Sequence, residues 1–172
     1  MIQLTYQAAF DSYHAIFRLF RLHPTITRKG PLHRDHVRIL DYYLLFPSRT
    51  EPIRLNPQDR RFKKLAKIYA HDESYVDLPE DHLLFSRMQP TQLAAIDTLA
   101  AQLYFDPEKL SSNLVVATGR LMPDAISKRV QEANSQDSEL LEFLESFASY
   151  PLMGVNGVKA RTGLLEYRYD AV

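Results

Sequence analysis

The sequence of 172 residues contains no cysteine. That absence excludes disulfide bonds, thiolate metal sites and thiol nucleophiles together. Only five glycines are present, and they form neither the Gly-x-Gly-x-x-Gly fingerprint of dinucleotide binding nor a Walker phosphate-binding loop. No apolar run approaches the length of about 18 residues that a membrane span requires. The chain therefore has no thiol chemistry, no recognisable phosphate-binding loop and no candidate membrane span.

The first residues, MIQLTYQAAFDSYH, have neither the basic start nor the continuous apolar stretch of a secretory signal. We therefore expect a cytosolic protein. The apolar fraction of 45% and the charged fraction of 24% are those of a globular chain that buries a core.

The charge is neutral overall but divided along the chain. Residues 1–70 carry 13 Lys and Arg against 5 Asp and Glu, which gives +8, whereas residues 71–172 carry 8 against 16, which gives −8. Such an asymmetry indicates a polyanionic or acidic partner for one half and a different partner for the other.

Apolar spacing predicts three helices in the basic half. The first covers residues 11–23 and ends at Pro24, with Tyr13 among the residues of its apolar stripe, and the second covers residues 33–46. The third runs from Asn56 to Ala70, because an Asn-Pro pair suits a helix start.

An extended stretch is predicted after these helices, at residues 74–77 and 82–88. Three helices followed by extended chain have the order of a winged-helix module, so we expect residues 1–88 to form a basic winged-helix-like region.

The acidic half, residues 89–172, is also predicted to be mainly helical. Helical periodicity runs from Pro90 to Phe105, over residues 123–133, and over a segment that Asp137 caps, which carries Leu140, Leu144 and Phe147. Alternation of apolar and polar residues at 165–169 predicts a small terminal β element. The expected fold class is therefore mainly α.

No constellation for catalysis is complete. His33 and His36 have a spacing that would place two imidazoles on one helical turn, but two ligands do not make a metal site. We expect no catalytic residues, no bound metal and no cofactor, and hence no enzyme.

Basic residues of the first half form the main candidate site. On the third helix they leave one face without acidic partners, although like charges oppose a helix. Cations in such a cluster bind phosphates of any sequence, whereas the alternative is an ordinary solvated face. The candidate DNA-binding residues are Arg28, Lys29, Arg34, Arg60, Arg61, Lys63, Lys64 and Lys67.

Acidic and aromatic residues of the second half form a candidate protein interface. The carboxylates would repel DNA, and exposed aromatic side chains often anchor interfaces. The candidate partner-binding residues are Glu139, Glu142, Glu145, Tyr167 and Tyr169.

Three strings resemble a known family. They are YQAAFDSYHAIFRLFRL near the start, RILDYYLLFP in the second predicted helix and TGLLEYRYD near the end. They resemble the middle components of bacterial three-component ABC systems, the group that includes Lamassu-type defence, from Tyr6 to Asp170. The resemblance implies an accessory subunit without activity of its own, which works with an SMC-like ABC ATPase and an effector, commonly a nuclease.

The sequence thus predicts a non-catalytic accessory subunit of a defence complex against phages or plasmids, which joins ATPase to effector and contacts DNA through its basic half. Two alternatives stay open. One is a free-standing winged-helix DNA-binding regulator, and the other is a small nuclease or metal-dependent hydrolase built around His33 and His36.

Overall fold

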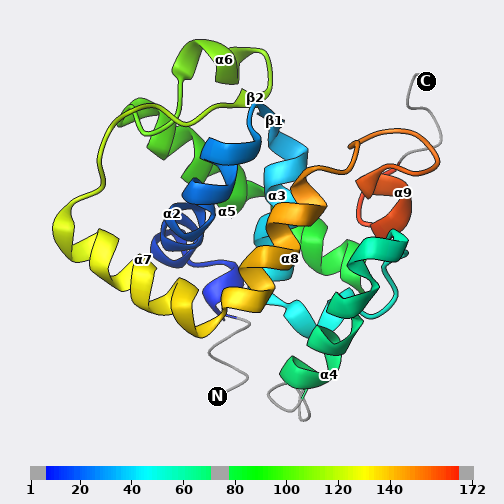
Figure 1. Cartoon of the computed structure of the whole chain (residues 1–172). Coiled ribbons are helices and arrows are strands. Elements are labelled where there is room, and N and C mark those ends of the chain that lie inside the picture. The colour runs from blue at the N-terminus through cyan, green and yellow to red at the C-terminus, as the bar shows by residue number, and fades with distance from the viewer. Residues whose placement is uncertain (1–6, 71–77, 167–172) are drawn as a thin grey trace.

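The computed structural model describes residues 7–70 and 78–166, which are predominantly helical (Figure 1). The α-helices are α2 (Ser12–Lys29), α3 (Arg34–Leu45), α4 (Lys64–Ala70), α5 (Asp81–Ala101), α6 (Pro107–Ser111), α7 (Asp124–Gln136), α8 (Ser138–Ala148) and α9 (Val158–Thr162). The 3-10 helices are η1 (Pro47–Thr50) and η2 (Pro57–Lys63), and the strands are β1 (Leu32–His33) and β2 (Leu114–Val115). Within these described ranges no helix is both long and apolar enough to cross a bilayer.

One apolar core joins the two halves of the sequence. Helix α2 lies against α3 and α5, and α8 packs on α3 near the middle of the molecule (Figure 1). The same buried cluster includes Leu22 and Ile39 from the basic half, and Phe105 and Phe147 from the acidic half. The division of charge along the sequence is therefore not a division of the core.

The predicted end of the first helix at Pro24 is wrong, because α2 continues through this proline to Lys29. A proline inside a helix removes one backbone donor, which normally favours termination. Here Thr25 and Ile26 are buried beyond it, and Gly30 N–H donates to the Ile26 carbonyl at 2.8 Å. Burial of the additional turn outweighs the lost hydrogen bond.

The apolar stripe predicted for this helix is also partly wrong. Tyr13 is 85% exposed, whereas Phe20 lies in the core as expected. Arg18 is buried and forms an ion pair with Asp41 at 2.6 Å, and Gln92 donates to the other carboxylate oxygen at 2.8 Å. A buried arginine of this kind is accommodated only because its charge is paired and hydrogen-bonded.

The extended stretch predicted at residues 82–88 is wrong, because these residues form the first turns of α5. Leu84, Phe85 and Met88 are buried at a helical spacing, which overrides the extended assignment. Helix α5 also continues through Pro90. The other predicted extended segment, residues 74–77, lies outside the described residues.

The small sheet does not have the arrangement of a wing. Strand β1 precedes α3 and pairs antiparallel with β2 of the second half, with Leu32 opposite Val115 and His33 opposite Leu114. The mainly helical class is confirmed, and the structure has a small sheet, although not at the predicted C-terminal position. The winged-helix arrangement is not confirmed.

Other helix predictions agree with the structure. Helix α3 matches the second predicted helix, and α7 and α8 follow Pro123 and Asp137 as expected. The third predicted helix begins at Pro57 but opens as the 3-10 helix η2 and becomes α-helical only from Lys64.

The C-terminal region contains a short helix that the sequence patterns did not indicate. Gly157 precedes α9, where a Cβ atom would lie 2.3 Å from the Met153 carbonyl oxygen, so this position requires glycine. Gly163 ends α9 with a φ of 66°, a left-handed conformation that glycine adopts readily. In the predicted strand at 165–169, Leu165 and Glu166 are not part of a strand, and the remainder lies outside the described residues.

Candidate functional site: a charged groove between α2 and α8

Helix α8 separates its apolar and acidic residues onto different faces. Leu140, Phe143, Leu144 and Phe147 are buried in the core. Glu139, Glu142 and Glu145 recur every three residues and occupy the other side, as the helical period requires. The core therefore fixes the direction in which these carboxylates extend.

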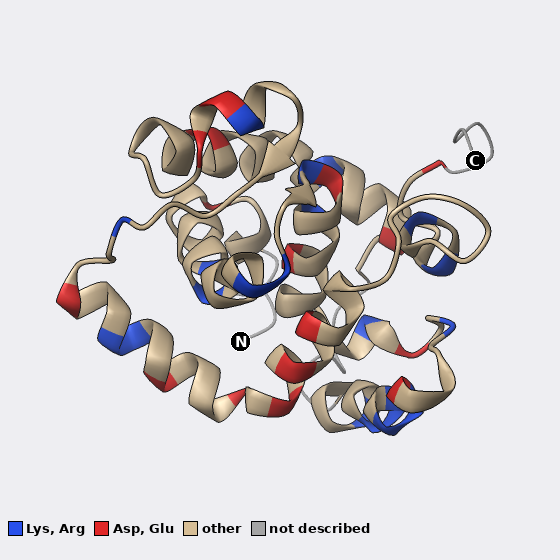
Figure 2. Cartoon of the chain, turned by 45° about the horizontal axis from the view of Figure 1, so that its top comes forward, with Lys and Arg blue, Asp and Glu red and all other residues tan. Residues whose placement is uncertain are grey.

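The acidic residues of α8 meet basic residues of the first half. Figure 2 shows Lys and Arg along the η2–α4 segment and Asp and Glu along α8. The ion pairs are Arg28–Glu145 at 2.5 Å, Arg61–Glu142 at 2.5 Å, Lys64–Glu139 at 2.7 Å and Arg21–Asp137 at 2.7 Å. Two residue sets that the sequence assigned to different partners, DNA and protein, thus contact each other. We call the first three pairs the α8 ion pairs.

The cations of the α8 ion pairs are solvent-exposed, whereas the Glu145 side chain is only 28% exposed. The side chains of Arg61 and Glu142 are 60% and 55% exposed, and that of Arg28 is 55% exposed. The hydrogen bond between Arg28 and Glu145 raises the pKa of the guanidinium and lowers the pKa of the carboxyl. Exposed pairs of this kind contribute about 0.2–1 kcal/mol each.

The fourth pair, Arg21–Asp137, is more enclosed. The Arg21 side chain is 12% exposed and also donates to Asn134 Oδ1 at 2.9 Å. The hydroxyl of Tyr69 donates to the second oxygen of Asp137 at 2.7 Å. This pair therefore connects α2, α4 and the junction of α7 and α8, and its role is structural.

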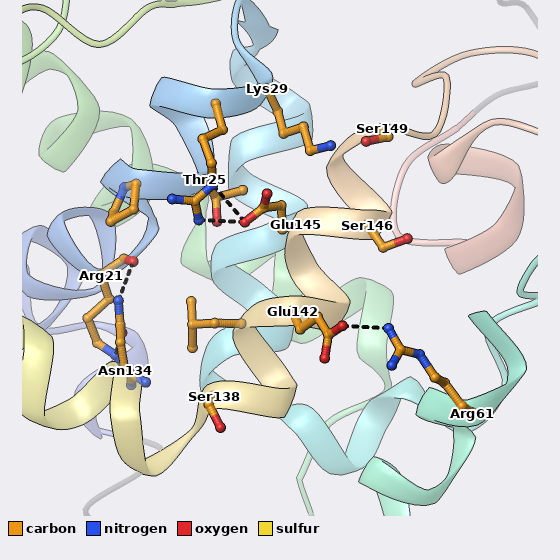
Figure 3. Close-up of a pocket in the computed structure, with 13 residues that line it drawn as sticks. Arg21, Thr25, Lys29, Arg61, Asn134, Ser138, Glu142, Glu145, Ser146 and Ser149 are labelled. Atoms are coloured by element: carbon orange, nitrogen blue, oxygen red, sulfur yellow. Dashed lines mark hydrogen bonds and ion pairs between the residues drawn. The ribbon is translucent and has the colours of Figure 1, made fainter. Parts of the chain in front are cut away.

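Arg21, Arg28, Arg61, Glu142 and Glu145 border a groove of about 560 Å³. Figure 3 shows the Arg61–Glu142 pair on one side of it, and Lys29 near Glu145 at the other end. The lining residues from α2 and η2 are Arg21, Pro24, Thr25, Arg28, Lys29 and Arg61. Those from α7 and α8 are Asn134, Ser138, Leu141, Glu142, Glu145, Ser146 and, after the end of α8, Ser149. Three of the predicted DNA-binding residues thus line one groove.

The remaining predicted DNA-binding residues differ in their surroundings. The Lys63 ammonium donates to the backbone carbonyls of Glu51, at 2.5 Å, and Ile53, and burial lowers its pKa. Arg60 and Lys67 are exposed, and neither forms an ion pair within the described part of the chain. Arg34 lies apart, at the start of α3.

His33 and His36 have separate structural roles. His33 Nδ1 accepts a hydrogen bond from Asp35 N–H at 3.1 Å and so caps α3. His36 is buried with Nε2 3.3 Å from the Phe147 carbonyl oxygen, and burial lowers its pKa to about 4. Across residues 7–70 and 78–166, no group of three or more His, Asp or Glu side chains is placed to hold a metal ion.

Two of the predicted partner-binding residues, Tyr167 and Tyr169, lie outside the described residues. Sequence reasoning missed Arg21 as a site residue, although it lines the groove. A signal was present for Arg21, because it lies seven residues before Arg28 and hence on the same face of one helix.

Comparison with known proteins gives one family. The model of the family described as ABC-three component (ABC-3C) system Middle Component 5 matches residues 4–170. No match was found among curated proteins or among solved structures.

Proposed function

The chain belongs to the ABC-three component system Middle Component 5 family. We propose that it acts as the accessory subunit that joins an SMC-like ABC ATPase to an effector nuclease in a defence complex. Membership makes it one of three components, which implies partner components. The joining role and a direct contact with DNA are the parts that we add.

The exposed cations of the η2–α4 segment support a DNA contact. Arg60 and Lys67 are exposed and lack ion-pair partners among the described residues, and they lie beside Arg61 and Lys64, which are paired only with exposed carboxylates. Such a surface binds phosphates through charge and counterion release, without reading the base sequence. This unpartnered pair of cations is the observation on which the DNA contact rests.

We propose that the other two components bind to the acidic half of the chain. The carboxylates of α8 lie at the surface, and the chain continues from Glu166 toward Tyr167 and Tyr169. Leu164 is buried, so a truncation that tests the terminal residues must keep it. Deletion of residues 167–172 should weaken co-purification with the other two components, and a thermal melt establishes that the truncated chain folds. Full recovery of the complex would assign docking to another surface.

We further propose that the subunit is non-catalytic. His33 and His36, the residues of the alternative hydrolase hypothesis, are engaged in a helix cap and in the core. The purified chain should neither hydrolyse ATP nor cut DNA with Mg²⁺ or Mn²⁺. Cleavage that is lost in His33→Ala protein with normal folding would contradict the accessory role.

A further inference from the structure

Three cations of the predicted DNA-binding set already have acidic partners. Arg28, Arg61 and Lys64 each contact a carboxylate of α8, at 2.5, 2.5 and 2.7 Å. A guanidinium or ammonium that binds a DNA phosphate must give up, or share, such a partner. The carboxylates of α8 therefore occupy positions that phosphates would otherwise take.

The pairs can exchange without disturbing the fold. The η2 segment and α8 also contact through buried apolar side chains, since the Phe62 and Phe143 rings lie 5.6 Å apart, so these elements do not depend on the ion pairs for their contact. Both side chains of the Arg61–Glu142 pair are exposed, as is Arg28 of the Arg28–Glu145 pair. The two pairs join residues 81 and 117 positions apart. Each pair of this kind changes an equilibrium constant by only about 1.4- to 5-fold.

Two other ion pairs, Arg18–Asp41 and Arg21–Asp137, are unsuited to exchange. Arg18 and Asp41 are buried, with side chains 6% and 2% exposed. Arg21 is held by both Asp137 and Asn134. Breaking these pairs would leave the buried Arg18 and the largely enclosed Arg21 without their acidic partners, which is unfavourable. By contrast, the cations of the α8 ion pairs, Arg28, Arg61 and Lys64, are exposed, so a ligand can reach these pairs.

We propose that α8 acts as a built-in competitor of DNA, so that phosphates displace Glu139, Glu142 and Glu145 from their cations and leave these carboxylates free for a basic surface of a protein partner. This inference rests on the proposed DNA contact and adds its regulation. A displaced carboxylate near DNA is repelled by the phosphates, and a basic partner relieves that repulsion. DNA and the protein partner therefore strengthen each other's binding, and the coupling is reciprocal.

The test replaces the three carboxylates by amides, in the variant Glu139→Gln, Glu142→Gln, Glu145→Gln. Its affinity for a duplex of random sequence, measured by fluorescence anisotropy, should rise about 3- to 150-fold, which is the product of three exposed pairs. The plot of log K against log[salt] should also become steeper, by up to about 0.9 for each cation released.

A matched variant, Glu108→Gln, Asp124→Asn, Glu132→Gln, removes the same charge from exposed positions of α6 and α7. It should bind DNA less tightly than the α8 variant, because it releases no cation. Circular dichroism melts establish that both variants fold.

A failure of the competition by α8 and a failure of the DNA contact give different results. Tighter binding and a steeper slope in the α8 variant alone support both. If the unaltered chain binds DNA and the two variants behave alike, the competition by α8 is refuted while the DNA contact stands. If neither the unaltered chain nor the α8 variant binds duplex DNA, both the contact and its regulation are refuted.

Discussion

Replacing Arg60 and Lys67 by glutamine tests the DNA contact at two exposed cations of the η2–α4 segment that form no ion pair among the described residues. Each phosphate contact contributes about 0.9 to the slope of log K against log[salt] on duplex DNA. Loss of two contacts should therefore reduce the magnitude of the slope by about 1.8. Between 50 and 200 mM salt, the ratio of unaltered to variant affinity should then shrink by about 12-fold.

The assay is fluorescence anisotropy with a labelled duplex over a salt series. The matched control is Lys109→Gln with Lys128→Gln, which removes two exposed cations from α6 and α7. The control should leave the slope unchanged, because long-range charge is screened within about 10 Å at 0.1 M salt. An unchanged slope in the Arg60 and Lys67 variant, or an equal change in the control, would refute the assignment of these residues to phosphates.

Three further predictions concern the fold. Tyr150→Phe removes the hydroxyl that donates to buried Asp59 at 2.7 Å, and it should lower the free energy of unfolding, measured by urea titration, by about 1–3 kcal/mol. An unchanged free energy of unfolding would show that this hydrogen bond does not stabilise the fold. Asp41→Ala leaves the buried Arg18 charge unpaired and should lower the free energy of unfolding by about 3–5 kcal/mol. The double replacement Arg18→Met, Asp41→Leu should lower it by less, and equal losses in the two variants would contradict a cost of the unpaired charge. Burial lowers the folded-state pKa of His36 to about 4, below the ordinary 6.5, so the unfolded chain binds the proton at a higher pH than the folded chain does. The free energy of unfolding should therefore fall by on the order of 3 kcal/mol as the pH drops from 6.5 to 4. The variant His36→Gln should flatten this part of the stability profile, and an unchanged profile would exclude His36 as the cause.

Local signals in the sequence were sufficient for several helices. Helices α3, α7 and α8 have helical apolar spacing and clear starts, and the structure places them as expected. The errors arose where tertiary burial overrides a local signal. Pro24 and Pro90 lie inside helices whose following residues, such as Ile26 and Ile96, are buried. A proline predicts a helix end only when the next turn has nothing to pack against.

The candidate site was predictable in its residues but not in its arrangement. Helical periodicity alone places Glu139, Glu142 and Glu145 on one face, and composition alone identifies a basic segment. That the two sets meet depends on how α8 packs against the first half, across separations of 81 and 117 residues. Neither periodicity nor composition contains that information, because both describe only neighbours along the chain.

The central claim is that this middle component joins the other two components of its system. The most direct measurement co-expresses all three, tags the ATPase component, and quantifies the effector recovered with it in the presence and absence of the chain. The account predicts that the effector co-purifies only when the chain is present. Equal recovery of the effector without the chain would contradict it.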